Sequence, residues 1–204
     1  MSGDFFYYFR QIDGIYVFNI GDVSGKEMDA ALLMEKASSL YHCLGKTMQS
    51  PGQIMALINE ELVEHSTRGM FITMIGGTYD PVSQRVTLCN AGHLPAIQRT
   101  VEGKYLEYES RSPPLGIMPD QIFEEVTFSL AGSSLYLYTD GLSEGLARTL
   151  AVPDQIQNLH KLIDQFCDKP RQERLKCFAQ EASSFDDVTI LLIEDDTSTI
   201  SESV

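Results

Sequence analysis

The chain has 204 residues, 43% of them hydrophobic and 22% charged, which suits a domain with its own core and excludes a disordered, collagen-like or coiled-coil chain. The 15 basic and 29 acidic residues give a formal net charge of −14, whose field repels phosphate backbones and anionic lipids, so neither nucleic acid nor a membrane surface is expected as a partner. No run approaches the ~20 apolar residues of a membrane span, and the first residues lack the order of a secretion signal, so we expect a cytoplasmic domain without membrane insertion.

Runs rich in β-branched and aromatic residues predict nine strands. In chain order they are Asp4–Phe9, Ile15–Ile20, Met70–Tyr79, Arg85–Asn90, Pro95–Arg99, Lys104–Tyr108, Phe123–Leu130, Ser134–Tyr138 and Val188–Ile193. Short turns join most of these runs, which favours antiparallel pairing.

Apolar residues at helical spacing predict four helices. The first follows a capping box at Ser24–Glu27 and ends at Gly45, and the second begins at Ser50 and Pro51. The others lie around Ile156–Phe166 and Leu175–Ala182. Because the helices come in pairs separated by groups of strands, we expect one sheet packed on another with helices outside.

The two ends of the chain differ from its middle. Residues 195–204 are acidic and have almost no apolar side chains, so we expect a disordered tail behind a domain of residues 1–194. The first predicted strand has no upstream segment to pair with, which suggests a fragment of a longer, regulated protein.

Four aspartates stand at the ends of predicted strands. Asp22 and Asp140 follow strands, whereas Asp4 and Asp186 open them. Antiparallel neighbours bring the beginning of one strand beside the end of the next, so all four positions can meet at one edge. Each aspartate taken alone is more simply explained as a turn former or a helix cap than as a ligand.

Four converging carboxylates would repel one another unless cations or protons neutralise them. Ligand sets made only of oxygen select hard ions such as Mg²⁺ or Mn²⁺. Two such ions ~4 Å apart lower the pKa of a bridging water and hold a phosphoryl oxygen, as in phosphate ester hydrolysis. Taken alone, the residues therefore indicate a candidate divalent metal site.

Seven blocks, in order, carry a family resemblance. They are Ser2–Phe6, Gly21–Met34, Phe71–Gly77, Asn90–Pro95, Pro114–Gly116, Tyr138–Glu144 and Asp186–Thr189. They resemble the metal-dependent PPM phosphatases, the protein phosphatase 2C superfamily, and within it the bacterial branch of stage II sporulation protein E and RsbU-like enzymes. The family commonly has aspartate where Tyr7 stands and glycine where Glu27 stands.

The resemblance implies an α+β fold, a four-layer αββα sandwich of two mainly antiparallel sheets flanked by helices. It implies two or more Mn²⁺ or Mg²⁺ ions at one edge of the sheets, with Asp22 and Asp140 as catalytic residues. The implied metal ligands are Asp4, Asp22, the backbone carbonyl of Val23, Asp140 and Asp186, with Asp187 in support.

The activity implied by the resemblance is that of a protein serine/threonine phosphatase. Its substrate would be a phosphorylated regulatory protein of the anti-sigma antagonist type, attacked in line by a metal-bridging water without a covalent phosphoenzyme. An upstream sensor or receiver domain is the implied regulatory partner. Two alternatives stay open, a pseudophosphatase module that binds a phosphoprotein or an anti-sigma-type partner without turnover, and a metal site with a structural role. His93 is more simply explained as a residue that orders its turn than as a general acid.

Overall fold

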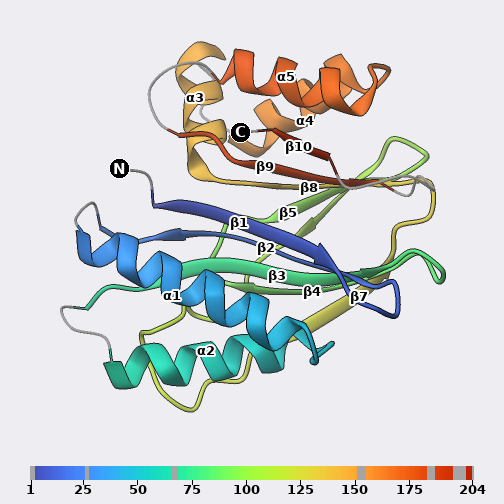
Figure 1. The fold of residues 1–204 in the computed structure, drawn as a ribbon. Helices are drawn as coiled ribbons and strands as arrows, with labels where there is room; N and C mark the ends of the chain where they lie inside the picture. Colours follow the sequence, from blue (N-terminus) through green and yellow to red (C-terminus); the bar gives the residue numbers. More distant parts are fainter. Residues whose placement is uncertain are drawn as a thin grey trace.

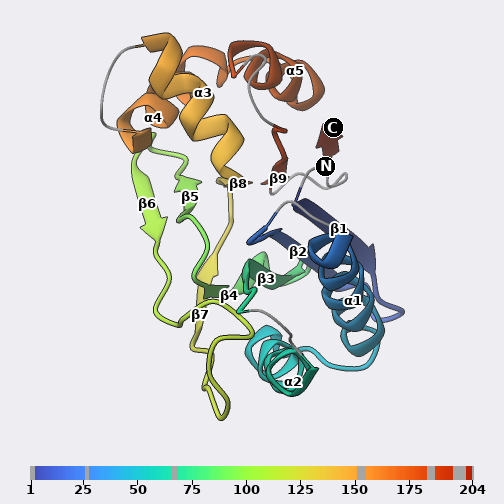
Figure 2. The same cartoon turned by 90° about the vertical axis from the view of Figure 1, so that its left-hand side faces the viewer.

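The computed structural model describes residues 3–25, 28–65, 69–150, 155–182, 187–194 and 201–203. Two five-stranded sheets pack face to face and helices cover their outer faces, which gives the four layers visible in Figures 1 and 2. The predicted α+β αββα sandwich is confirmed. No helix in these ranges has both the length and the apolar character to cross a membrane.

The first sheet is entirely antiparallel and has the order β1-β2-β3-β4-β7. Its strands are β1 (Asp4–Arg10), β2 (Tyr16–Val23), β3 (Ile72–Asp80), β4 (Arg85–Ala91) and β7 (Glu125–Ser129). Helices α1 (Met28–Gly45) and α2 (Pro51–His65) cover its outer face, in the lower part of Figure 1.

The second sheet has the order β10-β9-β8-β5-β6 and is also antiparallel. Its strands are β5 (Ala96–Arg99), β6 (Tyr105–Tyr108), β8 (Ser134–Tyr138), β9 (Ile190–Glu194) and β10 (Ser201–Ser203). Helices α3 (Asp140–Leu150), α4 (Gln155–Phe166) and α5 (Arg171–Glu181) cover its outer face, in the upper part of Figure 1.

Strand β2 shows how the side chains divide between the layers. Val17 packs in the cluster beneath α1 and α2, whereas Phe18 and Ile20 pack in the cluster between the two sheets. Because successive side chains of a strand point to opposite faces, Asp22 lies on the same face as Phe18 and Ile20. The end of β2 therefore presents a carboxylate to the side where the second sheet lies.

All nine predicted strands and all four predicted helices are present, with small shifts at their ends. Strand β2 extends through Asp22 to Val23, so Asp22 belongs to the strand and does not follow it. The Ser50 hydroxyl accepts a hydrogen bond from the Gln53 N–H and caps α2 as predicted. The Glu27 half of the capping box lies outside the described residues, while the Ser24 hydroxyl accepts the Phe71 N–H at 2.8 Å.

Helix α3 was not predicted, because Asp140 and its following glycines suggest a turn. The glycines have a different role here. A Cβ on Gly141 would clash with the Asp187 carbonyl, and a Cβ on Gly145 would clash with the Ala182 carbonyl. These glycines let α3 approach neighbouring backbone closely.

Strand β10 falls inside the tail that was expected to be disordered. Ser201–Ser203 pairs with β9 through backbone groups, Ser203 opposite Ile190. The open edge of β9 offers N–H and C=O groups that a strand of polar side chains can pair with. Residues 195–200 and Val204 lie outside the described ranges.

Candidate metal and phosphoryl site

Two of the predicted ligands stand directly opposite each other at one edge of the first sheet. Asp4 begins β1, and its Cα partner in the antiparallel register with β2 is Asp22. Directly paired residues have their side chains on the same face of a sheet. The register therefore brings together two carboxylates that are 18 positions apart in the chain.

Asp4 is also held by the second sheet. The hydroxyl of Thr139, at the end of β8, donates to Asp4 Oδ2 over 2.5 Å and accepts the backbone N–H of Thr189 at 3.1 Å. Burial raises the pKa of Asp4 to about 6; hydrogen bonds from Thr139 and Thr189 oppose this rise, and the charges of Asp22 and Asp140 add to it. Asp140, the third predicted carboxylate, therefore lies close enough for its charge to affect the pKa of Asp4.

Asp22 and the Val23 carbonyl, both predicted ligands, converge beneath Gly3. A Cβ placed on Gly3 would clash with Asp22 Oδ1 and would lie 2.8 Å from the Val23 carbonyl oxygen. The Gly3 carbonyl accepts the Val23 N–H at 3.2 Å, which fixes this approach. Because Gly3 has no side chain, Asp22 Oδ1 and the Val23 carbonyl oxygen can both lie next to it, as two candidate metal-ligating oxygens.

Asp140 begins α3, and its side chain is exposed. It lines a pocket of about 300 Å³ together with Asp22, Thr73 and the turn Gly92–Pro95. Asp140 therefore shares with Asp22 a hollow at the edge where both sheets end. The described lining contains two carboxylates and neither lysine nor arginine.

The fourth predicted carboxylate, Asp186, lies outside the described residues. Within those residues, no three Asp, Glu, His or Cys side chains are already arranged as a metal-binding group. Asp187 is exposed, and its carbonyl packs on Gly141, next to Asp140.

Three side chains at this edge were not assigned to the site from the sequence: Thr73, Thr139 and His93. Thr73 is the register partner of Asp22 on β3, and Thr139 binds Asp4. His93 was predicted to order its turn, and within that turn its backbone N–H donates to Asn90 Oδ1 at 2.9 Å. Thr139 could have been predicted as a supporting residue, because it is adjacent to the predicted ligand Asp140 and a hydroxyl there can hydrogen-bond another ligand.

Tyr7 points away from this edge. Its hydroxyl lies 3.4 Å from His42 Nε2 on α1, and the two rings are 4.5 Å apart between centroids. Its register partner is Asn19, three positions along β2 from Asp22. The tyrosine therefore belongs to the packing of α1.

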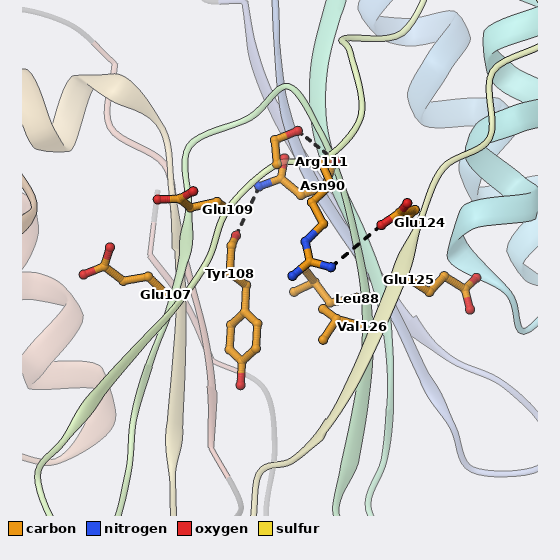
Figure 3. Close-up of a pocket in the computed structure, with 10 residues that line it drawn as sticks. Leu88, Asn90, Glu107, Tyr108, Glu109, Arg111, Glu124, Glu125 and Val126 are labelled. Carbon is orange, nitrogen blue, oxygen red and sulfur yellow. Dashed lines mark hydrogen bonds and ion pairs between the residues drawn. The ribbon is translucent and has the colours of Figure 1, made fainter.

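A second pocket, of about 210 Å³, is lined by residues of β4, β6 and β7 and of the segments next to them (Figure 3). Asn90 and four glutamates line it, and Arg111 pairs weakly with Glu124 at 3.8 Å. This acidic lining disfavours a phosphoryl group. The pocket with Asp22 and Asp140 is acidic as well, but there Asp22 stands opposite a second aspartate, Asp4, in the β1–β2 register.

The residues at the first pocket fit a hard divalent cation. The donor set is made of carboxylate and carbonyl oxygens, which Mg²⁺ and Mn²⁺ prefer. The raised pKa of Asp4 reports burial and crowded negative charge, both of which a cation would offset.

Comparison with known proteins decides the family. The model of the family "Stage II sporulation protein E (SpoIIE)" matches residues 12–195. The chain belongs to this family.

The similarity to relatives and to solved structures extends over most of this chain. Phosphoserine phosphatase RsbU of Bacillus subtilis is 27% identical over 203 residues, which cover 95% of this chain and 59% of RsbU. The structure of the PP2C phosphatase domain of SpoIIE with a fragment of its regulatory domain, also from Bacillus subtilis, has a TM-score of 0.80 at 18% identity, covering 100% of this chain and 60% of that one. RsbX in complex with magnesium has a TM-score of 0.68 at 19% identity, covering 94% of this chain and 86% of RsbX. The chain thus spans about six-tenths of the length of RsbU, and the SpoIIE-type fold is shared throughout.

Proposed function

We propose that this domain is a Mn²⁺- or Mg²⁺-dependent protein phosphatase that hydrolyses phosphoserine or phosphothreonine on a regulatory protein. Two observations support the proposal: Asp4 stands opposite Asp22 in the β1–β2 register, and Asp22 and Asp140 line the same pocket. RsbU, a relative over 95% of the chain, is named a phosphoserine phosphatase, which supports the reaction class.

The charge of the pocket favours a cation-dependent reaction. A phosphate monoester carries nearly two negative charges at neutral pH and would be repelled by Asp22 and Asp140. No lysine or arginine in the described lining offsets this repulsion. A divalent cation held by these carboxylates would offset the repulsion of the phosphoryl group.

We assign the residues as follows. Asp22, Asp140 and Asp4 would hold the cations, the Val23 carbonyl would add a neutral oxygen, and Asp186 is the proposed fourth carboxylate. Bound cations supply positive charge for the phosphoryl oxygens and lower the pKa of water at the site. Thr139 orients Asp4, and the turn Gly92–Pro95 forms the wall of the pocket.

We also propose a regulatory phosphoprotein of the anti-sigma antagonist type as the substrate and an upstream sensor or receiver domain as the regulator. The chain covers only 59% of RsbU, so that relative has further length outside the shared domain.

The test is hydrolysis of p-nitrophenyl phosphate and of a phosphoserine peptide with MnCl₂, in the parent chain and in Asp22→Asn and Asp140→Asn. We expect both variants to lose more than about 100-fold in rate, because losing a ligand should exceed the effect of losing a group that only supports one. Asp13→Asn is the matched control. Asp13 is an exposed turn residue whose two carboxylate oxygens accept hydrogen bonds, one from the Ile15 N–H and one from the Gln49 side-chain amide. The single amide oxygen of asparagine can keep the first of these bonds, and the site carboxylates are untouched.

Three results would contradict the proposal: no turnover by the folded parent at saturating Mn²⁺, unchanged turnover in both site variants, or equal loss in the control. A parent that binds the phosphopeptide without hydrolysing it would indicate the pseudophosphatase alternative. Stabilisation by Mn²⁺ without hydrolysis or peptide binding would indicate a structural metal site.

A further inference from the structure

His93 stands where the chain passes from one sheet to the other. It follows β4 of the first sheet and precedes β5 of the second, in a turn that Gly92 makes possible with a φ of 69°. The side chain is buried, with 7% exposed, and it lines the pocket that also contains Asp22 and Asp140.

The ring of His93 connects the two sheets. Its Nε2 lies 3.1 Å from the carbonyl oxygen of Tyr138 on β8, and its Nδ1 lies 3.0 Å from the Thr73 hydroxyl on β3. A carbonyl can only accept, so Nε2 carries the hydrogen. In the neutral ring Nδ1 then accepts the hydrogen of the Thr73 hydroxyl.

The neutral ring fits this environment. Burial lowers the pKa of His93 to about 4, with the Tyr138 carbonyl partly opposing this fall. Both ring nitrogens are already hydrogen-bonded within the protein. The ring is therefore placed to hold its neighbours and not to transfer a proton to a leaving group.

Each partner of the ring adjoins a proposed metal ligand. Thr73 is the register partner of Asp22. Its single hydroxyl hydrogen goes to His93 at 3.0 Å, so its 3.5 Å approach to the Asp22 carbonyl oxygen is a contact and not a second hydrogen bond. Tyr138 stands two positions before Asp140 at the end of β8. A change at His93 would therefore act on both sides of the pocket at once.

We propose that His93 is a positioning residue that sets the distance between Asp22 and Asp140 by joining the Thr73 hydroxyl to the Tyr138 carbonyl. The inference rests on the proposed metal site and deepens it. It predicts that losing the link weakens cation binding more than it weakens the chemistry that follows.

The two hydrogen bonds of the His93 ring can be removed separately by substitution. His93→Asn places an amide oxygen near the position of Nδ1 and keeps an acceptor for Thr73, whereas His93→Gln places an amide nitrogen near Nε2 and keeps a donor for Tyr138. His93→Ala removes both bonds. Thr73→Val removes one bond without altering the ring.

The experiment measures Mn²⁺ binding by electron paramagnetic resonance of the free ion, together with kcat and KM for p-nitrophenyl phosphate at increasing Mn²⁺. We expect His93→Ala to raise the half-saturating Mn²⁺ concentration about 10-fold, the lower end of the effects of removing a supporting group. The Asn and Gln variants should fall between His93→Ala and the parent. At saturating Mn²⁺, kcat should return to within about threefold of the parent value, because every proposed ligand is intact.

Thr73→Val should weaken Mn²⁺ binding in the parent background and have no further effect in His93→Ala, since the two residues act through one bond. His160→Ala, which removes a histidine stacked on Tyr105 at 3.8 Å between α4 and β6, is the matched control and should leave Mn²⁺ binding unchanged.

Unchanged Mn²⁺ binding in both His93→Ala and Thr73→Val would overturn the inference, as would a loss of kcat that excess Mn²⁺ does not restore. A lower melting temperature with unchanged Mn²⁺ binding would also overturn it and leave a purely structural role. The resonance assay measures Mn²⁺ binding and needs no turnover, so it tests the role of His93 even in a parent that hydrolyses nothing. An absence of hydrolysis in the parent would reject the proposed function and leave the inference about His93 to the binding data.

Discussion

The Thr139 hydroxyl, directly after β8 of the second sheet, donates a hydrogen bond to the carboxylate of Asp4, which begins β1 of the first sheet. Thr139 is completely buried, and its hydroxyl also accepts the N–H of Thr189, so its position is fixed from both sides. The alignment of Asp4 with Asp22 is thus set by contacts between the sheets as well as by the β1–β2 register.

Thr139→Val should weaken metal binding. The substitution keeps the shape of the side chain and removes the donor to Asp4, so we expect the half-saturating Mn²⁺ concentration to rise about 10-fold. Thr139→Ser keeps the hydroxyl and should restore most of the affinity. Thr127→Val, which breaks an exposed 3.0 Å contact with the Thr87 hydroxyl, is the control. Equal Mn²⁺ binding in Thr139→Val and in the control would contradict the role of Thr139.

Asp4→Asn should stabilise the metal-free fold above pH 6 while removing metal binding. The pKa of Asp4 is raised to about 6, so the folded chain holds this proton more tightly than the unfolded chain, and the stability contributed by the protonated group is lost as pH rises through about 6. An amide avoids the buried charge at pH 8. We expect a gain of roughly 1 kcal/mol in the free energy of unfolding, allowing for solvent screening of a half-buried group.

Urea unfolding in EDTA at pH 8 and pH 5 measures this effect for Asp4→Asn and the parent. The advantage of the variant should shrink at pH 5, where the parent carboxyl is largely protonated. Added Mn²⁺ should raise the stability of the parent alone. A variant less stable than the parent at pH 8 would show that the carboxylate is not strained by its neighbours.

The edge of the sheets could be predicted from the sequence because strand ends and carboxylates coincide there. Asp4 and Asp22 stand at the ends of runs with strong strand patterns, and antiparallel pairing follows from the short turn between them. The interactions that orient them could not be predicted. Thr139 and Thr189 contribute through a cross-sheet contact with Asp4, a residue far away in the chain, and no local pattern contains that information.

Helix α3 could not be predicted from the local sequence. Asp140 followed by Gly141 favours a turn in any local reading. What makes the segment helical is its packing, since Leu142 and Leu146 are buried against α4 and α5 and the two glycines permit close backbone approach. Tertiary packing here overrides local propensity.

Glu125→Ala should destabilise the fold by about 1 kcal/mol through the N-terminus of α2. The Glu125 carboxylate, on β7, accepts hydrogen bonds from the Ser50 hydroxyl at 2.5 Å and from the Gly52 N–H at 2.8 Å. It therefore places negative charge at the positive end of the helix dipole. Glu124→Ala, which removes an exposed pair with Arg111 at 3.8 Å, is the matched control and should cost little in urea unfolding. Equal losses in the two variants would argue against capping by Glu125.

Arg174→Met should be the most damaging of these changes to stability. Arg174 is 8% exposed and donates to Glu194 and to the Tyr136 hydroxyl, joining α5 to the second sheet. The substitution removes the charged hydrogen bonds of Arg174 and leaves Glu194 with Arg171 as its remaining cationic partner, so we expect a loss of about 2 kcal/mol at pH 7. Arg111→Met breaks an exposed pair and is the control.

The same pair gives a pH dependence with a defined sign. Burial alone would raise the pKa of Glu194, but hydrogen bonds from Ser134 and Arg171 and the charge of Arg174 lower it below the ordinary value of 4.5. Its contribution is therefore present above pH 4.5 and lost as pH falls further. The difference in unfolding free energy between the parent and Arg174→Met should shrink below pH 4.5. A constant difference would show that Glu194 is not the group involved.

The most direct test of the metal site is the anomalous scattering of crystals grown with MnCl₂, recorded at the manganese edge. We predict peaks within bonding distance of the carboxylates of Asp4, Asp22 and Asp140, and their disappearance in Asp22→Asn. A well-ordered edge without any such peak, or manganese bound only elsewhere on the surface, would contradict the account.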